Sequence, residues 1–191
     1  MPRPLSFDPQ QVRHQAMLLF WKSGYAETSM SQLTEALGIN KFSLYKQFGS
    51  KNELYLQSLA HYQKAIYLPL LKPLRTLEGK KSIVTYLTHF SEQVSRKGAS
   101  AGCFINNTLL AGSTLPDESR LAARSMAAEL RNLLSQNFDI ARQENELQAP
   151  QKDCLNFTLM TIQALLNTRR TLGPFVMQGN VRFFIKQLQQ W

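Results

Sequence analysis

The chain has few of the residues that build covalent or metal-held frameworks. Its 191 residues include only two cysteines, Cys103 and Cys154, which is too few for a disulfide scaffold or a cysteine-rich zinc site. The three histidines, His14, His61 and His89, have no metal-ligand spacing. We therefore expect no metal and no cofactor, and the low cysteine content favours a reducing compartment.

Long apolar runs and acidic residues are also scarce. No segment approaches the roughly 20 apolar residues that a membrane-spanning helix needs. The first residues lack the charged-then-apolar layout of a signal peptide, so we expect a cytoplasmic protein with no membrane partner. The 22 Lys and Arg residues outnumber the 13 Asp and Glu residues, which gives a net charge of +9. This balance favours a nucleic-acid partner, because neutralised phosphates release their counterions.

Sequence motifs of catalysis are missing as well. The chain has no Gly-rich phosphate loop, no metal-binding motif and no Gly-x-Ser-x-Gly nucleophile elbow. The adjacent acids Asp117 and Glu118 open a predicted helix, where carboxylates complement the helix dipole. We therefore expect that the protein is not an enzyme.

What the sequence does contain is helical periodicity along its whole length. Apolar residues recur every three or four positions, whereas strand-like alternation is absent, so we predict an all-α fold of about nine helices. The clearest helix starts are Asp8-Pro9, Ser29 with Gln32, Asn40, and Ser50 with Glu53. Pro69 and Pro73 interrupt the pattern. We therefore place an N-terminal domain at residues 1–52, a connecting helix at about 50–68 and a C-terminal domain at 69–191.

Residues 28–48 hold the most informative motif. Two short helices meet through Gly38-Ile39-Asn40, and a three-residue turn that begins with glycine is typical of a helix-turn-helix. Leu44 and Phe48 lie four residues apart and are expected to anchor the second helix. The rest of that helix is then free to enter a major groove. The residues predicted to contact DNA are Thr28, Ser29, Asn40, Lys41, Phe42, Ser43, Tyr45, Lys46 and Lys51.

These residue types match the chemistry of a DNA surface. Lysine ammonium groups can meet phosphates or guanine acceptors, and a serine hydroxyl can bond a base edge. Tyr45 offers a hydroxyl to a phosphate and a ring to a sugar or a thymine methyl. The start of the second helix, near Thr28, can bind a phosphate because helix N-termini carry unpaired N–H groups.

The same segment carries a specific string of residues. The string consists of Phe20, Gly24, Thr28-Ser29, Leu33, Ala36-Leu37-Gly38-Ile39-Asn40-Lys41, Leu44-Tyr45, Phe48, Lys51 and Glu53-Leu54. It resembles the TetR (tetracycline-repressor-like) family of transcription regulators, over about the first 60 residues. The resemblance implies a repressor that binds a palindromic operator as a homodimer and is relieved by a ligand. Phe42, Lys46 and Gln47 depart from the family pattern, which puts the operator sequence in question rather than DNA binding.

Two C-terminal segments are candidates for the dimer surface. One short helix reads too few base pairs, so such proteins bind as two-fold dimers with half-sites roughly 34 Å apart. The segments carry apolar residues on more than one side, which indicates burial against their own domain and against a second copy. The predicted interface residues are Leu155, Leu159, Ile162, Leu166, Phe184 and Leu188. The alternative is that these faces form only the core of one chain.

A predicted helix at about 101–110 offers a candidate ligand site. Cys103, Asn106, Asn107 and Leu110 share one face at spacings of three, four and seven residues. Inward-facing amides need partners, so these residues are candidate contacts for a small-molecule effector. Alternatively, the amides satisfy backbone groups and Cys103 packs as a small hydrophobe. Two other functions stay open: a regulator that senses oxidants or electrophiles through Cys103, and a helical protein-interaction module without specific DNA binding.

Overall fold

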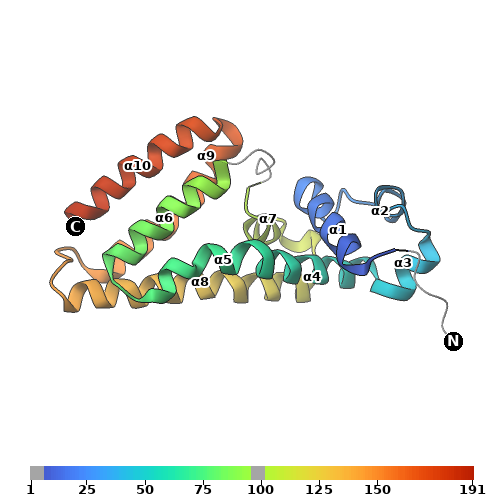
Figure 1. The fold of residues 1–191 in the computed structure, drawn as a ribbon, viewed down its shortest axis with the longest axis horizontal. Helices are drawn as coiled ribbons and strands as arrows, with labels where there is room; N and C mark the ends of the chain where they lie inside the picture. Colours follow the sequence, from blue (N-terminus) through green and yellow to red (C-terminus); the bar gives the residue numbers. More distant parts are fainter. Residues whose placement is uncertain (1–6, 96–101) are drawn as a thin grey trace. The chain divides into compact units, whose positions relative to one another are not determined.

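The computed structural model describes residues 7–95 and 102–191, and every regular element in those ranges is a helix (Figure 1). The α-helices are α1 (Pro9–Ser23), α2 (Met30–Leu37), α3 (Lys41–Phe48), α4 (Lys51–Tyr62), α5 (Leu68–Leu71), α6 (Lys80–Ser95), α7 (Phe104–Leu110), α8 (Asp117–Gln143), α9 (Gln151–Thr171) and α10 (Pro174–Gln190). A π-helical turn, Gln63–Tyr67, joins α4 to the short α5, so the ten α-helices of the described residues form nine separate α-helical segments; two 3-10 helices, Lys72–Thr76 and Gly112–Thr114, complete the helical structure of these residues. The all-α prediction is confirmed. Within these ranges, no helix combines the length and the apolar content that a bilayer span requires.

The chain forms two compact units. The first contains the described residues up to Ala65 together with Phe104–Ser125, and the second contains the described residues from Ile66 to Cys103 together with Met126–Trp191. The first unit is therefore larger than the N-terminal domain expected from the sequence, because α7 and the beginning of α8 are part of it. Helix α7 packs against α4 within this unit.

The helix starts of the first unit follow the sequence signals. The Asp8 side chain accepts a hydrogen bond from the Gln10 N–H at the start of α1. Capping boxes are present at α2 (Ser29 with Gln32) and at α4 (Ser50 with Glu53). After α2, Gly38 adopts a left-handed conformation with φ 64° and ψ 25°, which glycine reaches without the steric cost of a Cβ atom. Local capping therefore sets the lengths of the short helices.

The core of the first unit lies where α1 packs on α2 and α4, and α2 packs on α3. Its fully buried side chains include Met17, Phe20, Leu33, Leu44, Leu54 and Leu59. The ring of Tyr55 lies 5.0 Å from the ring of Phe20 and 5.3 Å from that of Phe104, measured between centroids. This aromatic cluster connects α1, α4 and α7, and the same core holds α3 in place.

In the second unit, α10 packs against both α6 and α9. Pro69 lies near its beginning, just after the π-helical turn, which spans the chain boundary between the two units. A proline ring in a regular helix collides with the carbonyl four residues earlier, and the wider π turn immediately precedes this proline. At the predicted interruption the chain therefore changes from α-helix to π-helix just before Pro69, and it remains helical beyond it. Within this unit the buried Asn137 amide donates hydrogen bonds to the carbonyls of Leu74 and Leu133, both at 2.8 Å.

Candidate nucleic-acid interface

Helix α3 is anchored at two points and open to solvent at others. Leu44 and Phe48 are buried. Five other side chains are exposed: Lys41, Phe42, Tyr45, Lys46 and Gln47. Phe42 is 76% exposed and Tyr45 is 43% exposed, which is unusual for aromatic residues of this size. A helix of eight residues is not stable alone in water, so the two anchors hold it while the exposed side chains remain available to a partner.

The N-terminus of α3 is closed by its own cap. The side-chain oxygen of Asn40 accepts the Ser43 N–H at 2.8 Å, and Ser43 itself is half-buried. Asn40 is exposed, so its side chain serves the helix start while lying at the surface. The Lys41 Nζ atom lies 6.0 Å from the centroid of the Tyr45 ring, at the outer limit of a cation–π contact. The exposed side chains of Asn40, Lys41 and Tyr45 therefore form one continuous surface at the start of α3 and along it.

The two residues before α2 differ in exposure. Ser29 is exposed, and its hydroxyl accepts the Gln32 N–H as part of the capping box. Thr28 is only 1% exposed, and its hydroxyl donates to the Gly24 carbonyl at 2.6 Å. The expectation that Thr28 contacts a phosphate is therefore corrected for its side chain. Its hydroxyl closes the turn between α1 and α2, because a buried hydroxyl needs a partner.

Lys51 begins α4 and lies against an aromatic ring. Its Nζ atom is 4.2 Å from the centroid of the Tyr25 ring, within the range of a cation–π interaction. Burial lowers the pKa of the Lys51 ammonium from its ordinary value. Tyr25 lies in the turn between α1 and α2. Sequence reasoning did not select it, because no local pattern indicates a contact with a residue on another helix.

Among the residues that the structure describes, no acid forms an ion pair with the lysines of this surface. The ion pairs found in the described residues are Arg75–Glu129, Lys81–Glu78 and Arg120–Asp117. None of these pairs involves Lys41, Lys46 or Lys51. Their ammonium groups are therefore available to an external anion such as a DNA phosphate.

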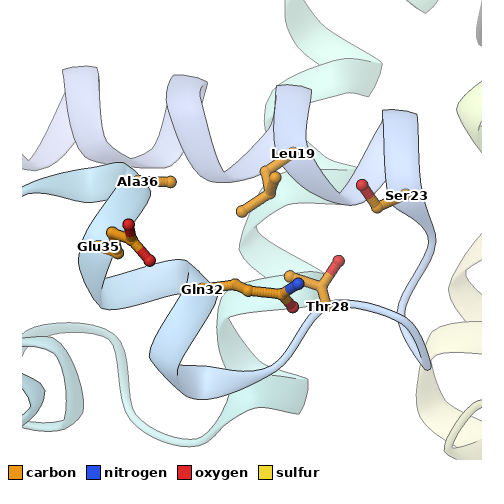
Figure 2. Close-up of a pocket in the computed structure, with 6 residues that line it drawn as sticks. All are labelled: Leu19, Ser23, Thr28, Gln32, Glu35 and Ala36. Atoms are coloured by element: carbon orange, nitrogen blue, oxygen red, sulfur yellow. The ribbon is translucent and has the colours of Figure 1, made fainter.

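A groove of 310 Å³ lies between α1 and α2 (Figure 2). Its lining residues are Leu19, Ser23, Thr28, Gln32, Glu35 and Ala36. Two of its polar groups already have local partners: the Thr28 hydroxyl bonds Gly24, and the Gln32 amide oxygen accepts the Ser29 N–H at 2.7 Å. We therefore assign no ligand to this groove.

The residues predicted to bind a ligand differ in exposure. Helix α7 begins at Phe104, later than predicted, and residue 101 lies outside the described residues. Asn106 and Asn107 are half-buried on α7, whereas Leu110 is 73% exposed. Cys103 precedes the helix and is half-buried. Leu110 is therefore unsuited to line a closed ligand cavity.

The residues predicted for the dimer interface are mostly core residues of the second unit. Five of them are buried within the chain: Leu155, Ile162, Leu166, Phe184 and Leu188. Leu159 is partly exposed. For these five residues the prediction is corrected, because side chains that already pack inside one chain cannot also form the surface that meets another. For Leu159 it stays a prediction. The large apolar residues exposed on α9 and α10 are instead Phe157, Met160, Phe175, Val176 and Phe183.

The chain is similar in sequence to known bacterial regulatory proteins. Residues 13–57 match the family model described as "Bacterial regulatory proteins, tetR family". The HTH-type transcriptional repressor BdcR of Escherichia coli (strain K12) is 35% identical over 104 residues, which are 54% of this chain and 53% of BdcR. The HTH-type transcriptional repressor ComR of the same organism is 31% identical over 107 residues, 55% of this chain and 51% of ComR. The chain thus spans about half the length of these two curated relatives.

A solved structure shows that the likeness in fold extends over nearly the whole chain. It is the TetR family transcriptional regulator CifR, as a cysteine mutant complexed with 26-bp double-strand operator DNA. The TM-score is 0.76 at 23% sequence identity, and the match covers 98% of each chain. At this identity the likeness concerns the fold alone.

Proposed function

Because residues 13–57 match the tetR family model of bacterial regulatory proteins, we propose that the chain is a member of this family and a transcriptional repressor that binds a palindromic operator and releases it when a small molecule binds. The observation that carries the proposal is the anchoring of α3 by Leu44 and Phe48, which leaves Phe42, Tyr45 and the α3 lysines exposed. An exposed helix with basic and aromatic side chains can enter the major groove and contact both phosphates and base edges. A regulator of chromosomal genes would act in the cytoplasm.

The proposed repressor is a homodimer that pairs through α9 and α10. Large apolar side chains on these adjacent helices face solvent, among them Phe157, Met160 and Phe183. On α9, Phe157 and Met160 are three residues apart and share one face of the helix. Exposed apolar side chains concentrated on one pair of helices are typical of a surface that another protein covers. A second copy of this chain would cover them and supply the second reading helix that a palindrome requires.

Relief by a ligand requires a link from the rest of the chain to the DNA-binding helices. Within the first unit, α7 supplies this link: the Tyr55 hydroxyl on α4 lies 2.8 Å from the Thr108 hydroxyl on α7, and both are buried. A ligand that displaces α7 would move α4, which carries Lys51. Such a ligand must bind the DNA-incompetent state more tightly than the DNA-bound state.

The DNA-binding proposal is tested by selecting preferred duplexes from a random-sequence library and measuring affinity at several salt concentrations. We expect an enriched palindrome and steep salt dependence. Lys46→Ala and Tyr45→Ala should each weaken operator binding by about tenfold, as expected for the loss of one contact, without unfolding the protein. Lys152→Ala, which removes the same charge from exposed α9, is the matched control and should bind nearly as wild type does.

Two results would contradict the proposal. One is binding without any sequence preference, which would favour a general interaction role. The other is unchanged affinity in both α3 variants, which would place the DNA surface elsewhere. Ligand relief is tested separately, by finding compounds that raise the melting temperature and measuring their effect on the operator complex. A compound that binds free and operator-bound protein equally well cannot act as an inducer.

A further inference from the structure

We propose that Tyr25 is a positioning residue for DNA binding, whose ring holds the Lys51 ammonium where it meets a backbone phosphate. The inference rests on the proposed DNA-binding function and adds to it a residue that lies outside α3. Tyr25 lies in the turn between α1 and α2, and it contributes to DNA binding by positioning Lys51 rather than by touching the DNA. The residue that touches the phosphate is Lys51.

The first argument is the geometry of the contact. The Lys51 Nζ atom lies 4.2 Å from the centroid of the Tyr25 ring. The face of an aromatic ring is negative, so a cation above it is attracted without being neutralised. A carboxylate partner would cancel the charge of Lys51, but no acid of the described residues forms an ion pair with it. The ring therefore fixes the ammonium and leaves its charge for a phosphate.

The second argument is that the ring is itself fixed. The Tyr25 ring stacks on Phe20, with centroids 6.4 Å apart, and meets Tyr55 edge to face at 5.2 Å. Both of those partners are buried core residues. A ring held by the core is a stable platform, whereas an exposed ring would move with solvent. The position of the Lys51 ammonium is thus determined by the core of the first unit.

The third argument concerns the backbone and the nearest acid. Lys51 is the first residue of α4, directly after the capping residue Ser50. The Glu53 side chain, which is the acid closest in sequence, accepts the Ser50 N–H at 2.6 Å, and this bond lowers the pKa of Glu53. The acid is thus turned toward the cap. Ordering a lysine side chain costs rotamer entropy, so an ammonium that is already ordered loses less of it on binding DNA.

The experiment uses the full chain and a fluorescein-labelled duplex of mixed sequence, because phosphate contacts do not depend on base sequence. Fluorescence anisotropy gives the Kd at several salt concentrations. Tyr25→Leu should weaken binding about two- to fivefold, as expected from the loss of one cation–π contact. Lys51→Ala should weaken it and reduce the slope of log Kd against log salt by about one. Tyr25→Phe keeps the ring and should bind like wild type.

Coupling between the two residues separates positioning from general damage. If the ring acts through the ammonium, Tyr25→Leu has no further effect in the Lys51→Ala background. The matched control is Lys46, for which no contact with Tyr25 is found in the described residues, and Tyr25→Leu should add its full effect to that of Lys46→Ala. Replacement of Tyr25 by pentafluorophenylalanine keeps the shape of the ring but reverses its charge distribution, and should weaken binding as Tyr25→Leu does. This variant still tests the proposal if the leucine substitution disturbs the fold.

The outcomes are distinct. Additive effects of Tyr25→Leu and Lys51→Ala, or a pentafluorophenylalanine variant that binds like wild type, would overturn the positioning role and leave DNA binding intact. A wild-type chain that binds no duplex would overturn the proposed function itself. In the free protein, the ε-methylene protons of Lys51 should show an upfield NMR shift from the Tyr25 ring that is lost in Tyr25→Leu, and its absence in wild type would overturn the contact.

Discussion

The imidazole rings of His14 and His61 join α1 to α4. Nδ1 of His14 lies 3.2 Å from Nε2 of His61, and the two rings meet edge to face at 75°. A hydrogen bond between two imidazole nitrogens requires that at least one of the rings is neutral. The pKa of His61 is lowered, chiefly by burial and then by the charges of His14 and Arg13. The pair therefore favours the neutral form of His61 in the folded protein.

We expect this pair to make stability depend on pH. The pKa of His61 is below its ordinary value of 6.5 in the folded chain, so the unfolded chain takes up the proton first as pH falls. The stabilisation is present above pH 6.5 and is lost as pH decreases toward the folded pKa. Thermal unfolding between about pH 5 and pH 8 measures the effect. His61→Gln should flatten this dependence, whereas the control His89→Gln, exposed on α6, should retain it. Equal pH dependence in wild type and His61→Gln would refute the assignment.

Phe42 is expected to affect which operator is chosen rather than stability. Phe42 is 76% exposed, so Phe42→Ala should change the free energy of unfolding by no more than about 0.5 kcal/mol. The same change removes the apolar surface that can contact a thymine methyl. Selection of random duplexes by both proteins should show a weaker preference for thymine at one position of each half-site in the variant. Identical profiles would mean that the ring does not contact bases.

The hydrogen bond between Tyr55 and Thr108 predicts that the loss of one partner costs more stability than the loss of the other. The Thr108 hydroxyl also donates to the Phe104 carbonyl at 2.8 Å, so Tyr55 is the donor in their shared bond. Burial raises the pKa of Tyr55 to about 12, which keeps this donor protonated. Thr108→Val leaves a buried hydroxyl without a partner and should cost about 1–3 kcal/mol, whereas Tyr55→Phe should cost less.

Urea unfolding of the two single variants and the double variant measures these costs. The double variant should be more stable than Thr108→Val, because it removes the unpaired hydroxyl. If Tyr55→Phe proves the more damaging single change, the assigned donor is wrong.

The proposed dimer predicts which exposed residues matter for association. Met160→Glu and Phe183→Glu each place a charge on an exposed apolar face, and should weaken association by about tenfold or more. Leu121→Glu on α8 introduces the same charge at another exposed leucine and is the control. Sedimentation velocity measures the dimer, and operator affinity should fall in parallel. Dimers of undiminished stability in both α9 and α10 variants would exclude this surface.

The sequence alone determined the local structure of the N-terminal third. Each helix start carries a capping residue, such as Asn40 before α3, and the turn between α2 and α3 needs the left-handed backbone that Gly38 provides. These signals act over three or four residues, so they can be recognised without knowing the fold. The same local pattern identified Leu44 and Phe48 as anchors, and their burial confirms it.

The packing of the helices determines which of the apolar helix faces are buried inside the chain. Helix α9 has apolar residues on two sides, and periodicity cannot tell that Leu155 packs inside the chain while Phe157 lies at the surface. The turn residue Thr28 was expected outside and is buried. The contact of Tyr25 with Lys51 and that of His14 with His61 join residues distant in the sequence, and only the packing of the helices brings them together. Capping and turn geometry depend on neighbouring residues, whereas burial and long-range contacts depend on how the helices pack.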